Sequence, residues 1–132
     1  MSGDHLFVYG TLRRESGGGM HSILAHNGEF LGDAILQGKL YRVGFYPGFV
    51  PSNNPQDVVY GEVYKLRGAD FVLSLLDDYE ECGPRFREPA FIRRKQSVKL
   101  NGGEIMSACV YIFARPTQTL QIIKSGDFLQ EP

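Results

Sequence analysis

The amino-acid sequence predicts an α+β fold in which a mostly antiparallel sheet or small barrel packs against one or two helices. Strand-like segments clearly outnumber helical ones along the 132 residues. They do not alternate with helices, as a doubly wound parallel sheet requires. One segment, residues 69–79, has the periodicity of a buried helix, and one Asn-Gly turn predicts a hairpin. We expect a single domain over residues 1–132.

The N-terminal segment predicts a buried strand followed by a loop. Residues 6–9 are apolar or aromatic, and the run stops at Gly10. Three consecutive glycines at 17–19 are typical of a loop. No Lys-Ser or Lys-Thr follows them, so they do not form a P-loop. Residues 20–25 predict a short helix.

Glycine and proline divide the next segment. Residues 30–43 predict two strands that are separated at Gly32 and Gly38. Residues 44–49 combine aromatic side chains with Pro and Gly, which favours an aromatic turn.

The remaining strands are predicted with clearer boundaries. Residues 58–66 alternate between two faces, as in a half-buried strand. Residues 91–100 and 104–113 predict a hairpin, because Asn-Gly-Gly at 101–103 joins two strand-like runs. Residues 120–128 predict a further short element.

The predicted helix at 69–79 carries a single apolar stripe. Its apolar positions recur at i, i+3, i+4 and i+7, and they are Val72, Leu75, Leu76 and Tyr79. Proline cannot continue a helix, so Gly83 and Pro84 end it.

Composition limits the classes of partner and the compartment. The chain has 14 basic and 15 acidic residues, and its basic residues are scattered, whereas nucleic-acid binding rests on clustered Lys and Arg. No apolar run approaches the roughly 20 residues that span a bilayer. The N-terminus lacks the features of an export signal, and two cysteines cannot form a disulfide framework. We expect a cytoplasmic protein without nucleic-acid or membrane partners; the oligomeric state is left open.

Several common catalytic signatures are missing. His5, His21 and His26 are too few and too badly spaced for a metal site, and there is no HExxH. Neither GxSxG nor GxGxxG is present, so the sequence contains no nucleophile elbow and no usual dinucleotide signature. We therefore expect no metal and no cofactor.

An acidic cluster at the end of the predicted helix supplies the first candidate. At about 100° per residue, Asp77, Asp78 and Glu81 point away from the apolar stripe, towards water. Glu80 lies at the rim of the buried face, one turn beyond Leu76. Desolvation and nearby like charges raise a carboxyl pKa, which is the tuning that a general acid or base needs near neutral pH. A solvated helix end is the alternative interpretation, and Glu81 takes the role of Glu80 if the helical register differs by one residue.

The turn after the first predicted strand is the second candidate. A strand that ends in Gly10 and Thr11 can direct backbone N–H groups at a carboxylate or an oxyanion, because glycine permits close approach. By itself, Gly-Thr after a strand also fits an ordinary turn.

Taken together and in order, several segments resemble the gamma-glutamylcyclotransferase-like (AIG2-like) family over nearly the whole chain. The segments that carry the resemblance are residues 7–12, 44–48, 59–64, 76–80, 93–94, 108–113 and 123–128. The resemblance implies a small, mostly antiparallel β-barrel flanked by one or two helices.

The resemblance also implies roles for particular residues. The loop that binds the glutamyl part of the substrate maps onto Tyr9, Gly10, Thr11 and Leu12, and the catalytic glutamate maps onto Glu80. Tyr46 and Tyr111 match family aromatics near the pocket, where a core role and a binding role are both open.

The implied activity is a transferase- or lyase-type cyclisation of a gamma-glutamyl amine or amide to 5-oxoproline, with release of an amine. The partner would be a small gamma-glutamyl substrate whose amine is not specified by the motifs. Two other functions are open: a non-catalytic binding protein that holds a small carboxylated metabolite in the same pocket, and a structural or interaction module.

Overall fold

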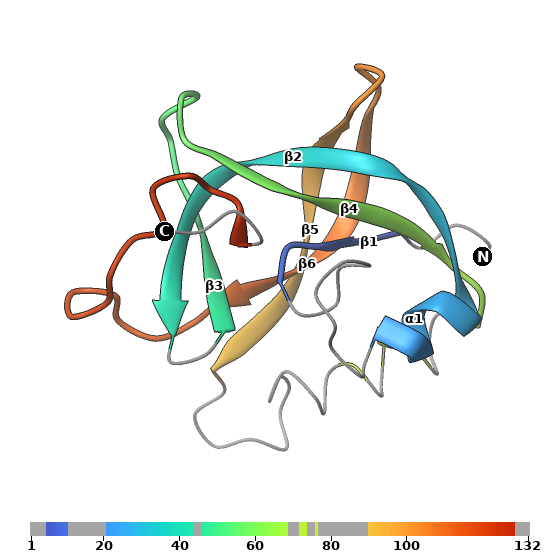
Figure 1. Ribbon diagram of the computed structural model, residues 1–132, viewed down its shortest axis with the longest axis horizontal. Coiled ribbons are helices and arrows are strands. Elements are labelled where there is room, and N and C mark those ends of the chain that lie inside the picture. The colour runs from blue at the N-terminus through green and yellow to red at the C-terminus, as the bar shows by residue number, and fades with distance from the viewer. Residues whose placement is uncertain are drawn as a thin grey trace.

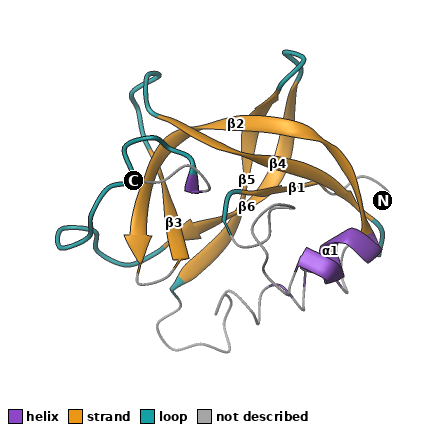
Figure 2. Cartoon of the chain, in the orientation of Figure 1, coloured by secondary structure: helices purple, strands orange, loops and turns teal. Residues whose placement is uncertain are grey.

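The computed structural model describes residues 5–10, 21–43, 46–68, 72, 73, 76 and 90–128, with the side chains of residues 21–23 and 46 left out. The elements of the described part are β1 (His5–Val8), α1 (His21–Asn27), β2 (Gly28–Val43), β3 (Tyr46–Pro51), β4 (Val58–Leu66), β5 (Phe91–Leu100) and β6 (Ile105–Phe113). Most of the described chain is strand (Figure 2).

The strands form one sheet that closes on itself. Their order is β1-β4-β2-β3-β6-β5, and an additional pairing of β1 with β6 completes the ring (Figure 1). Leu6 and Cys109 are the partners in that parallel pairing. β5 pairs with β6 along its length and reaches β2 at Ala34 and Ile35. All but two of the pairings are antiparallel, so the predicted α+β barrel is confirmed.

β2 is one continuous strand of 16 residues, so the prediction of two strands at 30–43 was wrong. The register against β4 shifts between Phe30 and Gly32, which makes Gly32 part of an irregularity rather than a strand end. A Cβ at Gly38 would overlap the ring of Phe49. Both glycines therefore mark a bend or a close contact within the strand, not an interruption of it.

β3 replaces the aromatic turn that the sequence predicts at residues 44–49. The strand begins at Tyr46, and Pro47 and Gly48 lie opposite Arg42 and Tyr41 of β2. On its other edge β3 pairs with β6 only at Phe49. Proline is tolerated where few ladder hydrogen bonds are needed, which explains why Pro47 does not end the strand.

Two buried clusters lie on the two faces of this closed sheet. The inner cluster fills the barrel and comprises Phe7, Tyr9, Ala34, Leu36, Leu40, Phe49, Val59, Val63, Val98, Ala108, Val110 and Ile123. The outer cluster comprises Leu6, Val8, Leu24, Tyr64, Leu66, Val72, Leu73, Leu76, Ala90, Phe91, Cys109, Tyr111 and Phe113. Alternate residues of β1, β4 and β6 thus belong to different clusters, as the two-residue period of a strand requires.

The predicted helix at 69–79 is described only at residues 72, 73 and 76, which are helical. Val72 and Leu76 of the predicted stripe are fully buried in the outer cluster. Helical packing on the outer face of the barrel is therefore observed where the structure describes it, while the rest of this segment lies outside the described residues.

The hairpin and the C-terminal segment complete the fold. β5 and β6 pair from Phe91–Phe113 to Lys99–Ile105, which confirms the predicted hairpin. In the C-terminal segment, the N–H of Ile123 donates to the carbonyl of Leu40 at 2.7 Å, and the carbonyl of Gly126 accepts from the N–H of Tyr60 at 2.8 Å. This segment is therefore attached to both β2 and β4.

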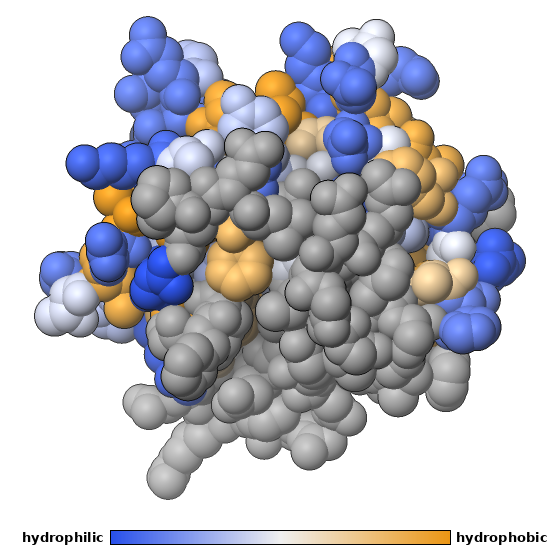
Figure 3. Space-filling view, viewed as in Figure 1, coloured by the Kyte–Doolittle hydropathy of each residue, from blue (hydrophilic) through white to orange (hydrophobic). Residues whose placement is uncertain are grey.

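In the view of Figure 3, the described residues that are visible carry both hydrophilic and apolar side chains. None of the helices in the described ranges has the length and apolar character needed to cross a membrane.

Candidate active site

The candidate site is at the end of β1, where the chain leaves the sheet through Tyr9 and Gly10. The ring of Tyr9 lies in the inner cluster. Its centroid is 6.4 Å from that of Phe7 and 5.9 Å from that of Phe49. The Tyr9 side chain is therefore directed into the barrel, and its backbone is the part that continues towards the predicted glutamyl-binding loop.

The hydroxyl of Tyr9 connects two other strands. It donates a hydrogen bond of 2.6 Å to the carbonyl oxygen of Tyr111 in β6. It also accepts one of 3.2 Å from the N–H of Phe49 in β3. β3 and β6 pair with each other only at Phe49 and Ile112, so this hydroxyl adds a link where the ladder is short. The end of β1 is thereby held against both strands.

Gly10 packs tightly against β3. A Cβ at this position would lie 2.7 Å from Cγ of Pro47, closer than real Cβ atoms approach. Only glycine allows the backbone to come this close to the proline ring. In general, backbone N–H groups that face a ligand at the end of a strand can bind a carboxylate or stabilise an oxyanion.

Tyr111 contributes its backbone and its ring to different parts of the molecule. Its carbonyl accepts from Tyr9, while its ring is buried in the outer cluster with Leu76. The structure therefore brings Tyr9, Gly10 and Tyr111 together. Tyr46 begins β3 opposite Val43, but its side chain is not described. The other predicted site residues, Thr11, Leu12 and Glu80, lie outside the described residues.

Glu62 also lies in this region, and it is not among the predicted site residues. Its side chain is 2% exposed, and among the described residues it is the only charged side chain that is buried. Tyr64 donates a hydrogen bond of 3.1 Å to Oε1 of Glu62. Glu62 also lies opposite Val8, the residue before Tyr9. The alternation of residues 58–66 places Glu62 on the same strand face as Tyr64 and Leu66. An acidic residue on such a face is unusual, and this could have been recognised from the sequence.

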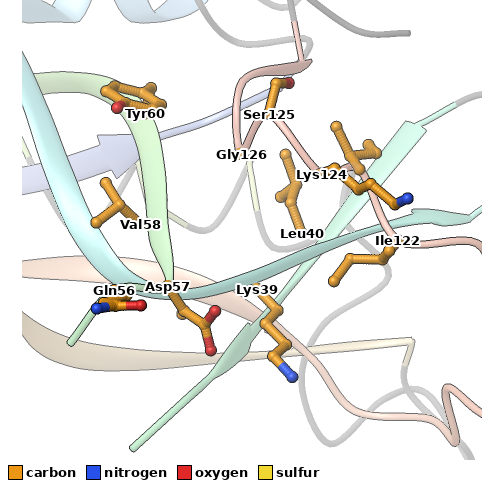
Figure 4. Close-up of a pocket in the computed structure, with 12 residues that line it drawn as sticks. Lys39, Leu40, Gln56, Asp57, Val58, Tyr60, Ile122, Lys124, Ser125 and Gly126 are labelled. Carbon is orange, nitrogen blue, oxygen red and sulfur yellow. The ribbon is translucent and has the colours of Figure 1, made fainter. Parts of the chain in front are cut away.

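A pocket of about 150 Å³ lies elsewhere, between β2, β4 and the C-terminal segment. Lys39, Asp57, Tyr60 and Lys124 are among its lining residues, and none of the predicted site residues is. The side chains of Lys39 and Lys124 point in different directions (Figure 4). The pocket therefore does not gather charges around one point. Within the described part of the chain, no three His, Cys, Asp or Glu side chains are grouped so that they could hold a metal ion.

Comparison with known proteins identifies the family. The family model "Gamma-glutamyl cyclotransferase, AIG2-like" matches residues 6–130. The chain belongs to this family. The gamma-glutamylcyclotransferase family protein YtfP of Escherichia coli K12 is 35% identical over 125 residues, which cover 94% of this chain and 95% of YtfP.

Solved structures agree with this gamma-glutamylcyclotransferase-like fold. The solution structure of E. coli YtfP has a TM-score of 0.63, with 96% of each chain covered. The crystal structure of YkqA from Bacillus subtilis has a TM-score of 0.71 at 27% identity; the match covers 97% of this chain but 40% of YkqA. An AIG2-like protein from Mus musculus has a TM-score of 0.70 at 24% identity, which shows likeness of fold, over 100% of this chain and 86% of the mouse protein.

Proposed function

We propose that this protein cyclises a gamma-glutamyl amine or amide to 5-oxoproline and releases the amine, with Glu80 as general acid/base. The observation that carries the proposal is the family match over residues 6–130. The sequence segments that match the family's glutamyl-binding loop and catalytic glutamate, residues 9–12 and Glu80, lie within that range.

The reaction needs no nucleophile from the protein. The α-amine of the substrate attacks its own side-chain carbonyl carbon, and a C–N bond forms that closes the five-membered ring. Glu80 accepts a proton from the attacking nitrogen. The tetrahedral intermediate then collapses, the original amide C–N bond breaks, and Glu80 returns the proton to the departing amine. The reaction as written uses neither a metal nor a cofactor.

Two contributions to the rate follow from this scheme. General acid/base catalysis is typically worth about 10²–10⁴ in rate, or roughly 3–5 kcal/mol. Binding the glutamyl chain in a bent conformation, with its amine close to its side-chain carbonyl, supplies much of the remaining rate enhancement. The substrate is then bound in the geometry in which it reacts.

The geometry at the end of β1 supports a binding role for the turn that begins at Tyr9 and Gly10. The link from Tyr9 to Tyr111 and Phe49, and the contact of Gly10 with Pro47, preorganise this part of the backbone. Preorganised N–H groups bind an anionic group without a reorganisation cost at the moment of reaction. In our proposal they hold the glutamyl carboxylate or the developing oxyanion.

The decisive experiment measures 5-oxoproline by mass spectrometry after incubation with a panel of substrates. The panel contains glutathione, gamma-glutamyl amino acids, a gamma-glutamyl polyamine and gamma-glutamyl-ε-lysine, which share the glutamyl end and differ in the amine. We expect release by the wild type and not by a folded Glu80→Gln variant. If no substrate releases 5-oxoproline while binding is still detected by thermal shift, the proposed enzymatic activity is wrong and a metabolite-binding protein is supported.

A further inference from the structure

The pocket between β2, β4 and the C-terminal segment has no part in the proposed function, because none of the predicted site residues lines it. Backbone hydrogen bonds fix its walls. The N–H of Ile123 donates to the carbonyl of Leu40 at 2.7 Å, and the N–H of Tyr60 donates to the carbonyl of Gly126 at 2.8 Å. A surface that is already ordered loses little conformational entropy when it binds a partner. The pocket is therefore preformed for binding.

Exposed apolar side chains concentrate around this pocket. Tyr60 is 45% exposed and Ile122 is 36% exposed, and they are two of the four large apolar side chains that are exposed in the described ranges. Both line the pocket. In Figure 4, the side chain of Leu40 lies between them. Apolar side chains that gather at a hollow and face water are typical of an interaction site, and tyrosine is enriched in such sites.

The size of the pocket limits what can enter it. Its volume is about 150 Å³. Sites for drug-sized ligands have volumes of roughly 300–1,000 Å³. A cavity of about 150 Å³ accommodates a molecule the size of benzene. The pocket therefore suits one apolar side chain of a partner better than a complete metabolite.

Two lysines give the pocket a positive rim. Lys39 and Lys124 are exposed lining residues, and neither forms an ion pair with another residue in the part of the chain that the structure describes. Asp57 is the only acidic residue among the described lining residues, and its Oδ2 accepts a hydrogen bond of 2.5 Å from the hydroxyl of Ser52. The two lysine side chains point in different directions (Figure 4). They therefore suit two separate carboxylates and not one small anion.

We propose that this pocket binds an extended acidic peptide segment of a partner protein. One apolar side chain of the peptide enters the pocket against Leu40, and acidic residues on either side of it pair with Lys39 and Lys124. Opposite charges around an apolar anchor favour acidic peptides and disfavour basic ones. The proposal goes beyond the proposed function and does not depend on it.

The test uses the full-length protein and short fluorescent peptides with blocked ends. In the first peptide a leucine lies between two pairs of glutamates; in the second, serine replaces the leucine; in the third, lysines replace the glutamates. Fluorescence anisotropy measures Kd, and NMR amide shifts locate the peptide. We expect the first peptide to bind at least ~10-fold more tightly than the other two. We expect its shifts to be concentrated at residues 38–40, 56–60 and 122–126, which include the lining residues.

Variants of the rim separate this surface from general charge effects. In the double variant Lys39→Glu and Lys124→Glu, attraction becomes repulsion at both positions, so we expect binding at least ~10-fold weaker. Ile122→Ser removes part of the apolar wall without changing charge, and we expect it to weaken binding as well. The matched control is Lys95→Glu, since Lys95 is exposed on β5 and does not line the pocket. Circular dichroism establishes that the variants are folded.

Several results would overturn the proposal. They are absence of binding by the first peptide up to about 1 mM, equal binding of the lysine peptide, and wild-type affinity in the folded double variant. Sedimentation tests for a second copy as the occupant, which a wild-type dimer that becomes monomeric in Ile122→Ser would indicate. Glutarate tests for a small dicarboxylate, which would be the occupant if it shifted the same amides at the same concentration as the peptide. Either result would replace the acidic peptide.

Discussion

The hydroxyl of Tyr9 donates a 2.6 Å hydrogen bond to the backbone carbonyl of Tyr111, across 102 residues of sequence. The same hydroxyl accepts from the N–H of Phe49, so a single oxygen connects β1, β3 and β6. The two tyrosines are thus joined by a hydroxyl and a carbonyl, and their rings lie in different buried clusters. These two hydrogen bonds fix the position at which the backbone of β1 leaves the barrel.

Replacement of Tyr9 by phenylalanine removes this link and keeps the ring. The carbonyl of Tyr111 and the N–H of Phe49 then lose a buried partner, which costs about 1–3 kcal/mol of unfolding free energy. Urea denaturation measures the change. Tyr60→Phe is the control, because Tyr60 is 45% exposed, and we expect it to unfold with the wild-type midpoint. Equal midpoints for the two variants would show that the Tyr9 hydroxyl does not stabilise the barrel.

Gly10→Ala introduces a methyl group against Pro47. The nearest proline atom would be 2.7 Å away, so the turn or β3 must shift. We expect a loss of about 1–3 kcal/mol in stability and a larger proportional loss of ligand binding. Gly102→Ala is the matched control, since a Cβ at Gly102 meets nothing within 4 Å. The two variants are compared by thermal denaturation and by thermal shift with 5-oxoproline; indistinguishable results would refute the tight contact.

Gly126→Ala tests the attachment of the C-terminal segment. Gly126 has a φ of 70°, and a Cβ there would collide with the carbonyl of Val58. Gly68 is the control, because its φ of 60° imposes the same backbone strain with open space around the Cβ. Backbone strain alone costs about 1 kcal/mol in either variant, so we expect Gly126→Ala to lose clearly more stability than Gly68→Ala. Equal losses in chemical denaturation would mean that the collision is relieved without cost.

The variants Glu80→Gln and Glu81→Gln test which of the two carboxylates transfers the proton, a choice that the sequence leaves open. If Glu80 transfers the proton, its amide variant loses about 10²–10⁴ in kcat, while Glu81→Gln stays within a few fold of the wild type. Circular dichroism establishes that both variants are folded, and 5-oxoproline release measures kcat. The reverse order of effects would assign proton transfer to Glu81.

Much of the secondary structure was predictable because local pattern and tertiary environment agree. Residues 58–66 alternate in sequence, and the two faces of β4 do lie in two different buried clusters. The Asn-Gly-Gly turn predicted the hairpin of β5 and β6, and Gly103 has a φ of 99°, which suits glycine.

The predicted strand boundaries were wrong where glycine and proline make close contacts between strands. Gly38 and Pro47 are strand breakers by local propensity, yet one makes room for the Phe49 ring and the other lies at an edge with few ladder bonds. Such contacts join residues far apart in sequence, so no local pattern reports them. For the same reason Glu62 could be recognised as unusual on its strand face but not as a neighbour of the turn at Tyr9.

The sequence by itself determined the strand-rich α+β class, the hairpin, the buried stripe at Val72 and Leu76 and the family resemblance, because these depend on periodicity, turn chemistry and ordered motifs. Only the tertiary structure decided that the sheet closes through Leu6 and Cys109 and that the Tyr9 hydroxyl meets the Tyr111 carbonyl. Barrel closure depends on strand register and on the way the chain packs around its own core, which are properties of the whole fold and not of any segment.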